Sequence, residues 1–137
     1  MNKFINDACA IIAFFKGEKG CEKVTELLKQ AETKETIIYM HSINVYEVYY
    51  DFYRAENKTK ADEILKDIQE MPFIFVKDIT NEIILYSAYF KAKYKMSLAD
   101  SILLGQAKIL DAKVISADRH EFEIVEKNEI IKFNWIR

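Results

Sequence analysis

The sequence predicts an α/β fold, a three-layer α/β/α sandwich with a central parallel sheet. Short apolar runs alternate with helical segments along the whole chain, in the order strand, one or two helices, strand. The apolar runs lack the polar–apolar alternation of a half-exposed strand, which indicates that helices cover both faces of the sheet. Glycine is scarce and Pro72 is the only proline, so we expect one domain over residues 1–137 without an internal linker.

Five strands are expected, each a short apolar run. They are predicted at 3–7, 36–41, 73–76, 113–116 and 129–133. Helices are predicted between them, at 8–17, 20–33, 42–54, 58–70, 80–94, 97–110 and 120–127. Gly17 and Pro72 stop helices, and Ser42 and Ser97 are good N-caps, with His41 expected in the loop before its helix.

Charge and composition exclude several classes of function. The net charge of −2 is not that of a typical double-strand DNA binder. Cys9 and Cys21 form no zinc-binding spacing and no signal peptide is visible, so we expect reduced thiols and a cytoplasmic location. No apolar run approaches the length of a membrane span, so no membrane association is expected.

Acidic residues collect at one edge of the predicted sheet. Asp7 ends the first strand and Asp118 follows the fourth, so both lie at the carboxyl edge, where parallel sheets bind ligands. From Asp100 its helix descends roughly 15 Å, at about 1.5 Å per residue. The strand that follows climbs back roughly 16 Å, at about 3.3 Å per residue. Asp100 therefore returns to the same edge, where the helix that carries Glu47 also begins.

The four carboxylates thus converge on one rim, and no lysine or arginine is placed among them. Like charges this close cannot all stay ionised without a counter-charge. A hard divalent cation with oxygen ligands is the natural partner, and Mg²⁺ or Mn²⁺ fits this description.

Four segments, taken in order, carry a family resemblance. They are Asp7 after the first strand, Glu47 in HSINVYE, the helix SLADSILLGQA (97–107) and the segment VISADRHEF (114–122). The chain resembles the PIN-domain ribonucleases along essentially its whole length, most closely the VapC-type toxins of toxin–antitoxin pairs. The most specific part is S-L-A-D-x-x-L/I-x-x-x-A, followed by a strand and S/T-x-D-x-x-x-F.

The resemblance implies a PIN-like fold and a Mg²⁺- or Mn²⁺-dependent endoribonuclease that hydrolyses phosphodiester bonds of RNA, acting as a toxin. It assigns the catalytic and metal-binding roles to Asp7, Glu47, Asp100 and Asp118. Ser116 would hydrogen-bond a ligand carboxylate, and Glu121 would be an additional acid. The implied partners are the RNA substrate, a small antitoxin protein and a second copy of the chain in a homodimer.

The residues around Asp7 depart from the family pattern. Relatives commonly have a hydroxyl residue directly after this Asp and then Ser or Asn, whereas this chain has Ala8 and Cys9. Asn6 stands where an apolar residue is usual. We therefore expect the hydrogen bond to Asp7 to be absent or rerouted through Asn6, which affects metal affinity and rate more than the reaction class.

Each acid also has a purely structural interpretation. Asp100 could complete a capping box with Ser97, Asp7 could cap the helix after it, and Asp118 could occupy a turn. Glu47 could face solvent on the polar stripe that it shares with Asn44, Asp51 and Arg54. Asp51, four residues after Glu47, would however repel it and lend the helix no support. The corresponding alternative function is a non-catalytic PIN-like scaffold that binds RNA or protein, and the departures at Ala8 and Cys9 favour this alternative.

Basic and aromatic side chains near the rim have two interpretations as well. Arg119, His120 and the lysines of KAKYK (91–95) could contact RNA phosphates or be ordinary solvated cations. The helix 42–54 carries more aromatic residues than one buried stripe can hold. We expect it to contribute to a groove for the antitoxin, a proposal that fails if Tyr50 and Tyr53 are fully buried.

Overall fold

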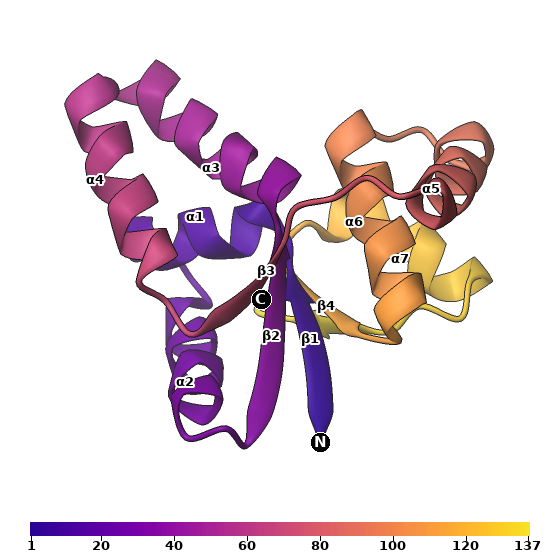
Figure 1. Cartoon of the computed structure of the whole chain (residues 1–137), viewed down its shortest axis with the longest axis horizontal. Coiled ribbons are helices and arrows are strands. Elements are labelled where there is room, and N and C mark those ends of the chain that lie inside the picture. The colour runs from indigo at the N-terminus through magenta and orange to yellow at the C-terminus, as the bar shows by residue number, and fades with distance from the viewer.

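The computed structural model describes residues 1–137 and contains a five-stranded parallel sheet between two layers of helices (Figure 1). The strand order is β3-β2-β1-β4-β5, and every neighbouring pair is parallel. The strands are β1 (Asn2–Asn6), β2 (Thr36–His41), β3 (Phe73–Val76), β4 (Lys113–Ser116) and β5 (Phe133–Trp135). The predicted α/β/α sandwich is confirmed.

Seven helices form the two outer layers. They are α1 (Ala8–Lys16), α2 (Cys21–Glu32), α3 (Ser42–Ala55), α4 (Lys58–Gln69), α5 (Asn81–Lys93), α6 (Leu98–Leu110) and α7 (Arg119–Asn128). The first four pack on one face of the sheet around Phe4, Ile38 and Met40, and the last three pack on the other face around Ile5 and Val114. The neighbouring residues Phe4 and Ile5 of β1 thus enter opposite cores, which explains why both are apolar. No helix combines the length and apolar character that crossing a bilayer requires.

The start of α3 differs from the expected one, because His41 and not Ser42 is the N-cap. The His41 side chain is fully buried, and its Nδ1 accepts a hydrogen bond from the backbone N–H of Ile43 at 3.0 Å. Its Nε2 then carries the proton and donates to the carbonyl of Asp78 at 3.0 Å. The imidazole, which was expected in a loop, therefore ties α3 to the segment after β3.

The last strand is also displaced from its predicted position, since it covers Phe133–Trp135 and not 129–133. The Glu129 carboxylate accepts hydrogen bonds from Lys93 and from Tyr94, which hold the chain against the end of α5. Of the two isoleucines that suggested a strand, Ile131 is buried and Ile130 is 92% exposed. The segment crosses to the sheet edge first and pairs with β4 only from Phe133 onward.

Candidate metal centre

A pocket of about 510 Å³ lies at the carboxyl ends of β1 and β4, and α1, α3 and α6 contribute to its wall. Figure 1 shows α3 and α6 rising on the two sides of this position. No lysine, arginine or histidine lines the pocket, whereas five carboxylates do: Asp7, Glu47, Asp51, Asp100 and Asp118. Of these acids only Asp51 forms ion pairs, so the other four concentrate negative charge without a cationic side-chain partner.

Three of these acids lie together. Asp7, Glu47 and Asp100 each place one carboxylate oxygen within 4.8 Å of the other two. Asp7 directly follows β1, Glu47 lies in the second turn of α3, and Asp100 lies in the first turn of α6. The predicted convergence is confirmed for these three residues, which we call the acidic triad.

The environment of the triad favours the protonated carboxyl when no cation is bound. Burial raises the pKa of Asp7. Burial, followed by the charges of Asp7 and Glu47, raises the pKa of Asp100 to about 8. Burial raises the pKa of Glu47 to about 6 against the opposing effect of the Asn44 hydrogen bond. Three oxygen ligands that resist simultaneous ionisation, with no cationic side chain in their pocket, fit a hard divalent cation.

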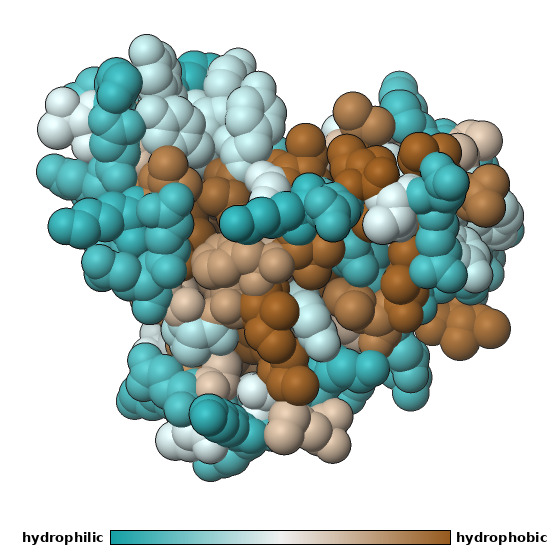
Figure 2. Space-filling model, viewed as in Figure 1, coloured by the Kyte–Doolittle hydropathy of each residue, from teal (hydrophilic) through white to brown (hydrophobic).

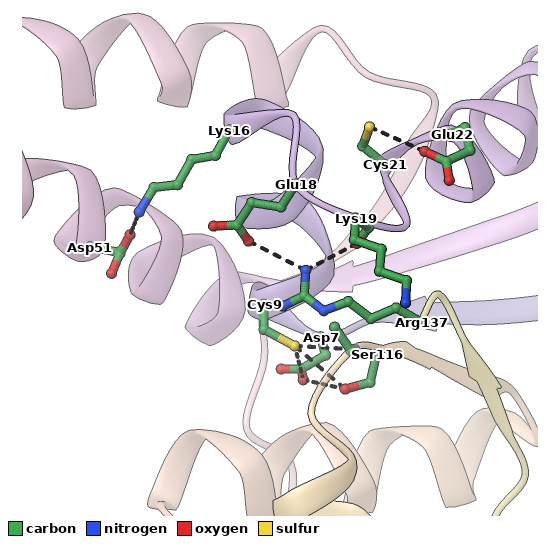
Figure 3. Close-up of polar contacts among 11 residues, drawn as sticks. Asp7, Cys9, Lys16, Glu18, Lys19, Cys21, Glu22, Asp51, Ser116 and Arg137 are labelled. Carbon is green, nitrogen blue, oxygen red and sulfur yellow. Dashed lines mark hydrogen bonds and ion pairs between the residues drawn. The ribbon is translucent and has the colours of Figure 1, made fainter.

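Two side chains hold Asp7 through the same carboxylate oxygen (Figure 3). The Ser116 hydroxyl donates to Oδ2 at 2.8 Å, and the Cys9 thiol donates to Oδ2 at 2.9 Å. Neither contact uses Oδ1, which stays available to a ligand. The alternative in which Asp7 caps a helix is wrong, because its side chain makes no capping hydrogen bond to α1.

The expected rerouting through Asn6 is wrong as well. The Asn6 amide is buried and neither its nitrogen nor its oxygen has a hydrogen-bond partner. The thiol of Cys9 makes the contact with Asp7 instead. Cys9 was the residue that sequence reasoning missed: it stands where relatives carry Ser or Asn, and its S–H is also a donor.

Glu47 is held by a neighbour one turn earlier on α3. The Asn44 amide donates to Glu47 Oε1 at 3.1 Å, and Asn44 is fully buried, so this part of the expected polar stripe does not face solvent. Asp51, one turn later, forms ion pairs with Lys16 at 3.1 Å and with Arg54 at 3.4 Å. Its charge is thereby neutralised, which relieves the repulsion expected from an acid four residues after Glu47.

Asp100 combines two roles that the sequence left open. The Ser97 hydroxyl accepts a hydrogen bond from the backbone N–H of Asp100 at 3.1 Å and caps α6. The Asp100 side chain at the same time takes part in the triad. The cap therefore fixes the first turn of the helix that presents the carboxylate.

Asp118 lines the same pocket and does not belong to the triad. Its Oδ1 accepts from the backbone N–H of Glu121 at 3.1 Å and caps α7, and its own N–H donates to Ser116 Oγ at 3.0 Å. The charge of Asp118 contributes to the raised pKa of Asp7, and that of Glu121 to the raised pKa of Asp100. Both residues thus lie near the triad and act on it through their charge.

Comparisons with known proteins identify a matching family and solved structures of similar fold. A family model of the PIN domain matches residues 4–128. Similar solved structures include VapBC2 from Rickettsia felis bound to a DNA fragment from their promoter, with a TM-score of 0.75, 16% identity, and coverage of 97% of this chain and 98% of that chain. DNA-bound VapBC from Salmonella typhimurium has a TM-score of 0.75 and 13% identity, over 100% of both chains.

A toxin–antitoxin complex from Klebsiella pneumoniae has a TM-score of 0.62 and 18% identity, over 86% of this chain and 88% of that one. A search of curated proteins finds no match. At these low identities the solved structures show a shared fold. The family model begins within β1 and covers β2, β3, β4 and the triad, and so the chain belongs to the PIN domain family.

Proposed function

We propose that the chain is a divalent-metal-dependent endoribonuclease, the VapC-type toxin of a toxin–antitoxin pair. The observation that carries this proposal is the acidic triad, three carboxylate oxygens within 4.8 Å of one another in a pocket without a cationic side chain. Membership of the PIN domain family and the fold shared with VapBC structures support the same conclusion.

Asp7, Glu47 and Asp100 would hold Mg²⁺ or Mn²⁺. A cation bound there supplies activation of a water and neutralises charge at the attacked phosphate. Ser116 and Cys9 fix the orientation of Asp7, and Asn44 fixes that of Glu47. Asp118, whose Oδ1 is engaged by α7, keeps Oδ2 free and is proposed as the fourth acid, with Glu121 as additional negative charge nearby.

A protein partner is supported by apolar side chains on both rims of the pocket. Tyr46 and Tyr50 on α3 are 60% and 51% exposed and stack with their centroids 6.3 Å apart, while Leu98 on α6 is 60% exposed. Tyr53 is also exposed, so the condition set for an antitoxin groove along α3 is met. We propose that the antitoxin covers this rim.

A second copy of the chain is the partner proposed for the apolar face near α5. Ile79, Ile84 and Leu85 are exposed there by 52%, 52% and 71%. Figure 2 shows hydrophobic residues gathered over the part of the molecule where Figure 1 draws α5 and α6. We place the protein in the cytoplasm, the compartment that supplies RNA and keeps thiols such as Cys9 reduced.

The test is cleavage of single-stranded RNA with Mn²⁺ or Mg²⁺ and with EDTA. Asp100→Asn should lower the rate at least about 100-fold, because it removes one ligand and its charge. Asp67→Asn makes the same chemical change at an exposed position on α4 and should cleave like the wild type. Undiminished cleavage by Asp100→Asn, or cleavage that persists in EDTA, would refute the proposal.

The alternative of a non-catalytic scaffold was motivated by Ala8 and Cys9. The thiol of Cys9 restores the hydrogen bond to Asp7 that the departure was expected to remove. The departure at Cys9 therefore no longer favours a scaffold, whereas Ala8 still lacks the hydroxyl that relatives commonly have at this position.

A further inference from the structure

A second groove, of about 700 Å³, follows the outer edge of β5 and shares no lining residue with the metal centre. Residues from four elements and from the segment before β5 line it: Lys23, Lys113, Arg119, Glu126, Glu129, Ile130, Ile131, Lys132, Phe133, Asn134 and Trp135. We call this the β5 groove. Nothing in the proposed chemistry of the triad uses it.

The β5 groove carries surplus positive charge. Lys23, Lys113 and Lys132 form no ion pair, although the chain as a whole has a net charge of −2. The two acids in the groove are already engaged: Glu126 accepts from the Trp135 indole N–H at 3.1 Å, and Glu129 pairs with Lys93 at 3.1 Å. Lys23 Nζ donates to the backbone carbonyl of Trp135 at 2.7 Å, whereas Lys113 and Lys132 are available to an anionic ligand.

An aromatic stack forms the end of the groove nearest the carboxyl edge of the sheet. The rings of Phe133 and Trp135 are parallel within 8°, with centroids 4.9 Å apart. The guanidinium of Arg119 lies over the Trp135 ring, 4.8 Å from its centroid. Arg119 Nε donates to the carbonyl of Arg137 at 2.9 Å, which holds the guanidinium plane on the stack. Its only acidic partner is the exposed Glu123, at 3.7 Å.

The stack lies close to the metal centre along the chain and across the sheet. Arg119 directly follows Asp118, which lines the acidic pocket. Trp135 pairs in register with Ser116, whose hydroxyl donates to Asp7. A strand of nucleic acid bound at the triad could thus extend directly onto the Phe133–Trp135 stack.

We infer that the β5 groove binds single-stranded RNA next to the cleavage site, with a base on the Phe133–Trp135–Arg119 stack and its phosphates on the lysines. Stacking surfaces combined with basic side chains are the usual means of holding an unpaired strand, and arginine planes stack on bases as aromatic rings do. The inference rests on the proposed ribonuclease function and adds to it a binding site that would make the enzyme prefer unpaired RNA.

Trp135 is the only tryptophan, so its fluorescence reports on this groove alone. The probe is a single-stranded oligoribonucleotide of about 12 nucleotides, added to the full-length Asp100→Asn protein in EDTA so that no cleavage occurs. We expect saturable quenching of Trp135. Lys132→Glu and Arg119→Ala should each weaken binding about tenfold and reduce the dependence of log K on log salt by about 0.7.

Lys66→Glu, the same charge reversal on α4, is the matched control and should bind like the parent protein. In cleavage assays with an otherwise wild-type chain, Lys132→Glu should raise KM and leave kcat unchanged. No response of Trp135 to the oligonucleotide would overturn the inference. Equal quenching by duplex RNA, or by polyglutamate of the same charge, would also overturn it. These ligands offer negative charge without an unpaired base, so the groove would then recognise charge alone.

The binding assay separates this inference from the proposed function. Quenching by RNA in Asp100→Asn, together with no cleavage by the wild type in Mn²⁺ or Mg²⁺, would support the groove and refute the ribonuclease. Normal metal-dependent cleavage with an unresponsive Trp135 and an unchanged KM in Lys132→Glu would refute only the groove.

Discussion

The thiol of Cys9 donates a hydrogen bond to Oδ2 of Asp7 at 2.9 Å, beside the Ser116 hydroxyl that reaches the same oxygen. Burial, followed by the negative charge of Asp7, raises the pKa of this thiol, so it remains protonated and can act as a donor. Cys9 therefore does for Asp7 what a hydroxyl or amide does at the corresponding position of the family pattern.

Replacing this thiol should change metal affinity in a way that depends on the donor. Cys9→Ala removes one of the two hydrogen bonds that orient Asp7, and we expect Mn²⁺ to bind about tenfold more weakly. Cys9→Ser keeps a donor and should bind Mn²⁺ like the wild type. Titration of each variant with Mn²⁺ checks this, and equal affinity in Cys9→Ala and the wild type would show that Cys9 does not position Asp7.

The stability of the metal-free protein should fall as the pH rises. The folded pKa of Asp100 is about 8, above its ordinary value of 3.8, so the folded state holds this proton more tightly than the unfolded state does. The contribution of Asp100 to the free energy of unfolding should therefore be largest below about pH 3.8. It should decrease as the pH rises from there to about 8. Urea unfolding in EDTA at about pH 5 and about pH 8 measures this difference.

Removing the charge of Asp100 should remove most of that pH dependence. We expect Asp100→Asn to be more stable than the wild type by about 2 kcal/mol near pH 8, after allowing for solvent screening of a partly exposed group. Asp67→Asn should keep the wild-type dependence. If Asp100→Asn kept the wild-type pH dependence of the free energy of unfolding, the charge of Asp100 would not be its cause.

Adding a divalent cation should reverse the loss of stability at high pH. Binding to the folded state alone stabilises it by about 2.7 kcal/mol at a free concentration of 100 times Kd. We expect Mn²⁺ to raise Tm clearly near pH 8, and less near pH 5, where protons compete for the same oxygens. A Tm that responds equally at both values would contradict a carboxylate site with raised pKa values.

His41 should matter more for folding than the serine beside it. His41→Ala removes the N-cap of α3 and leaves the Asp78 carbonyl without its partner, which should cost about 2–3 kcal/mol of unfolding free energy. Ser42→Ala should cost less than about 0.5 kcal/mol, since Ser42 is not the cap. Urea denaturation ranks the two variants, and the reverse order would contradict the assignment of the cap.

The sequence predicted the elements that are marked by a pattern within their own residues. Apolar runs located four strands, and the lengths of α6 and β4 were enough to return Asp100 to the edge where Asp7 ends. The last strand was misplaced because Ile130 and Ile131 form an apolar run whether or not they pair with a neighbour. The hydrogen bonds of Glu129 to Lys93 and Tyr94 at the end of α5 hold this segment away from β4, and the apolar pattern does not reveal them.

The side chains that support the triad were harder to predict for a related reason. Whether Cys9 or Asn6 reaches Asp7 depends on which of them points into the pocket, and sequence spacing does not fix that direction. Asn44 was assigned to a polar stripe, although the packing of α3 buries it against Glu47. Contacts of this kind are decided by side-chain direction in the assembled core.

The most direct test of the acidic triad is calorimetric titration of Mn²⁺ into three proteins: the wild type, Asp100→Asn and Asp67→Asn. We expect a binding site of similar affinity in the wild type and in Asp67→Asn, and binding at least about tenfold weaker in Asp100→Asn. Equal affinity in all three proteins, or no binding to the wild type, would contradict it.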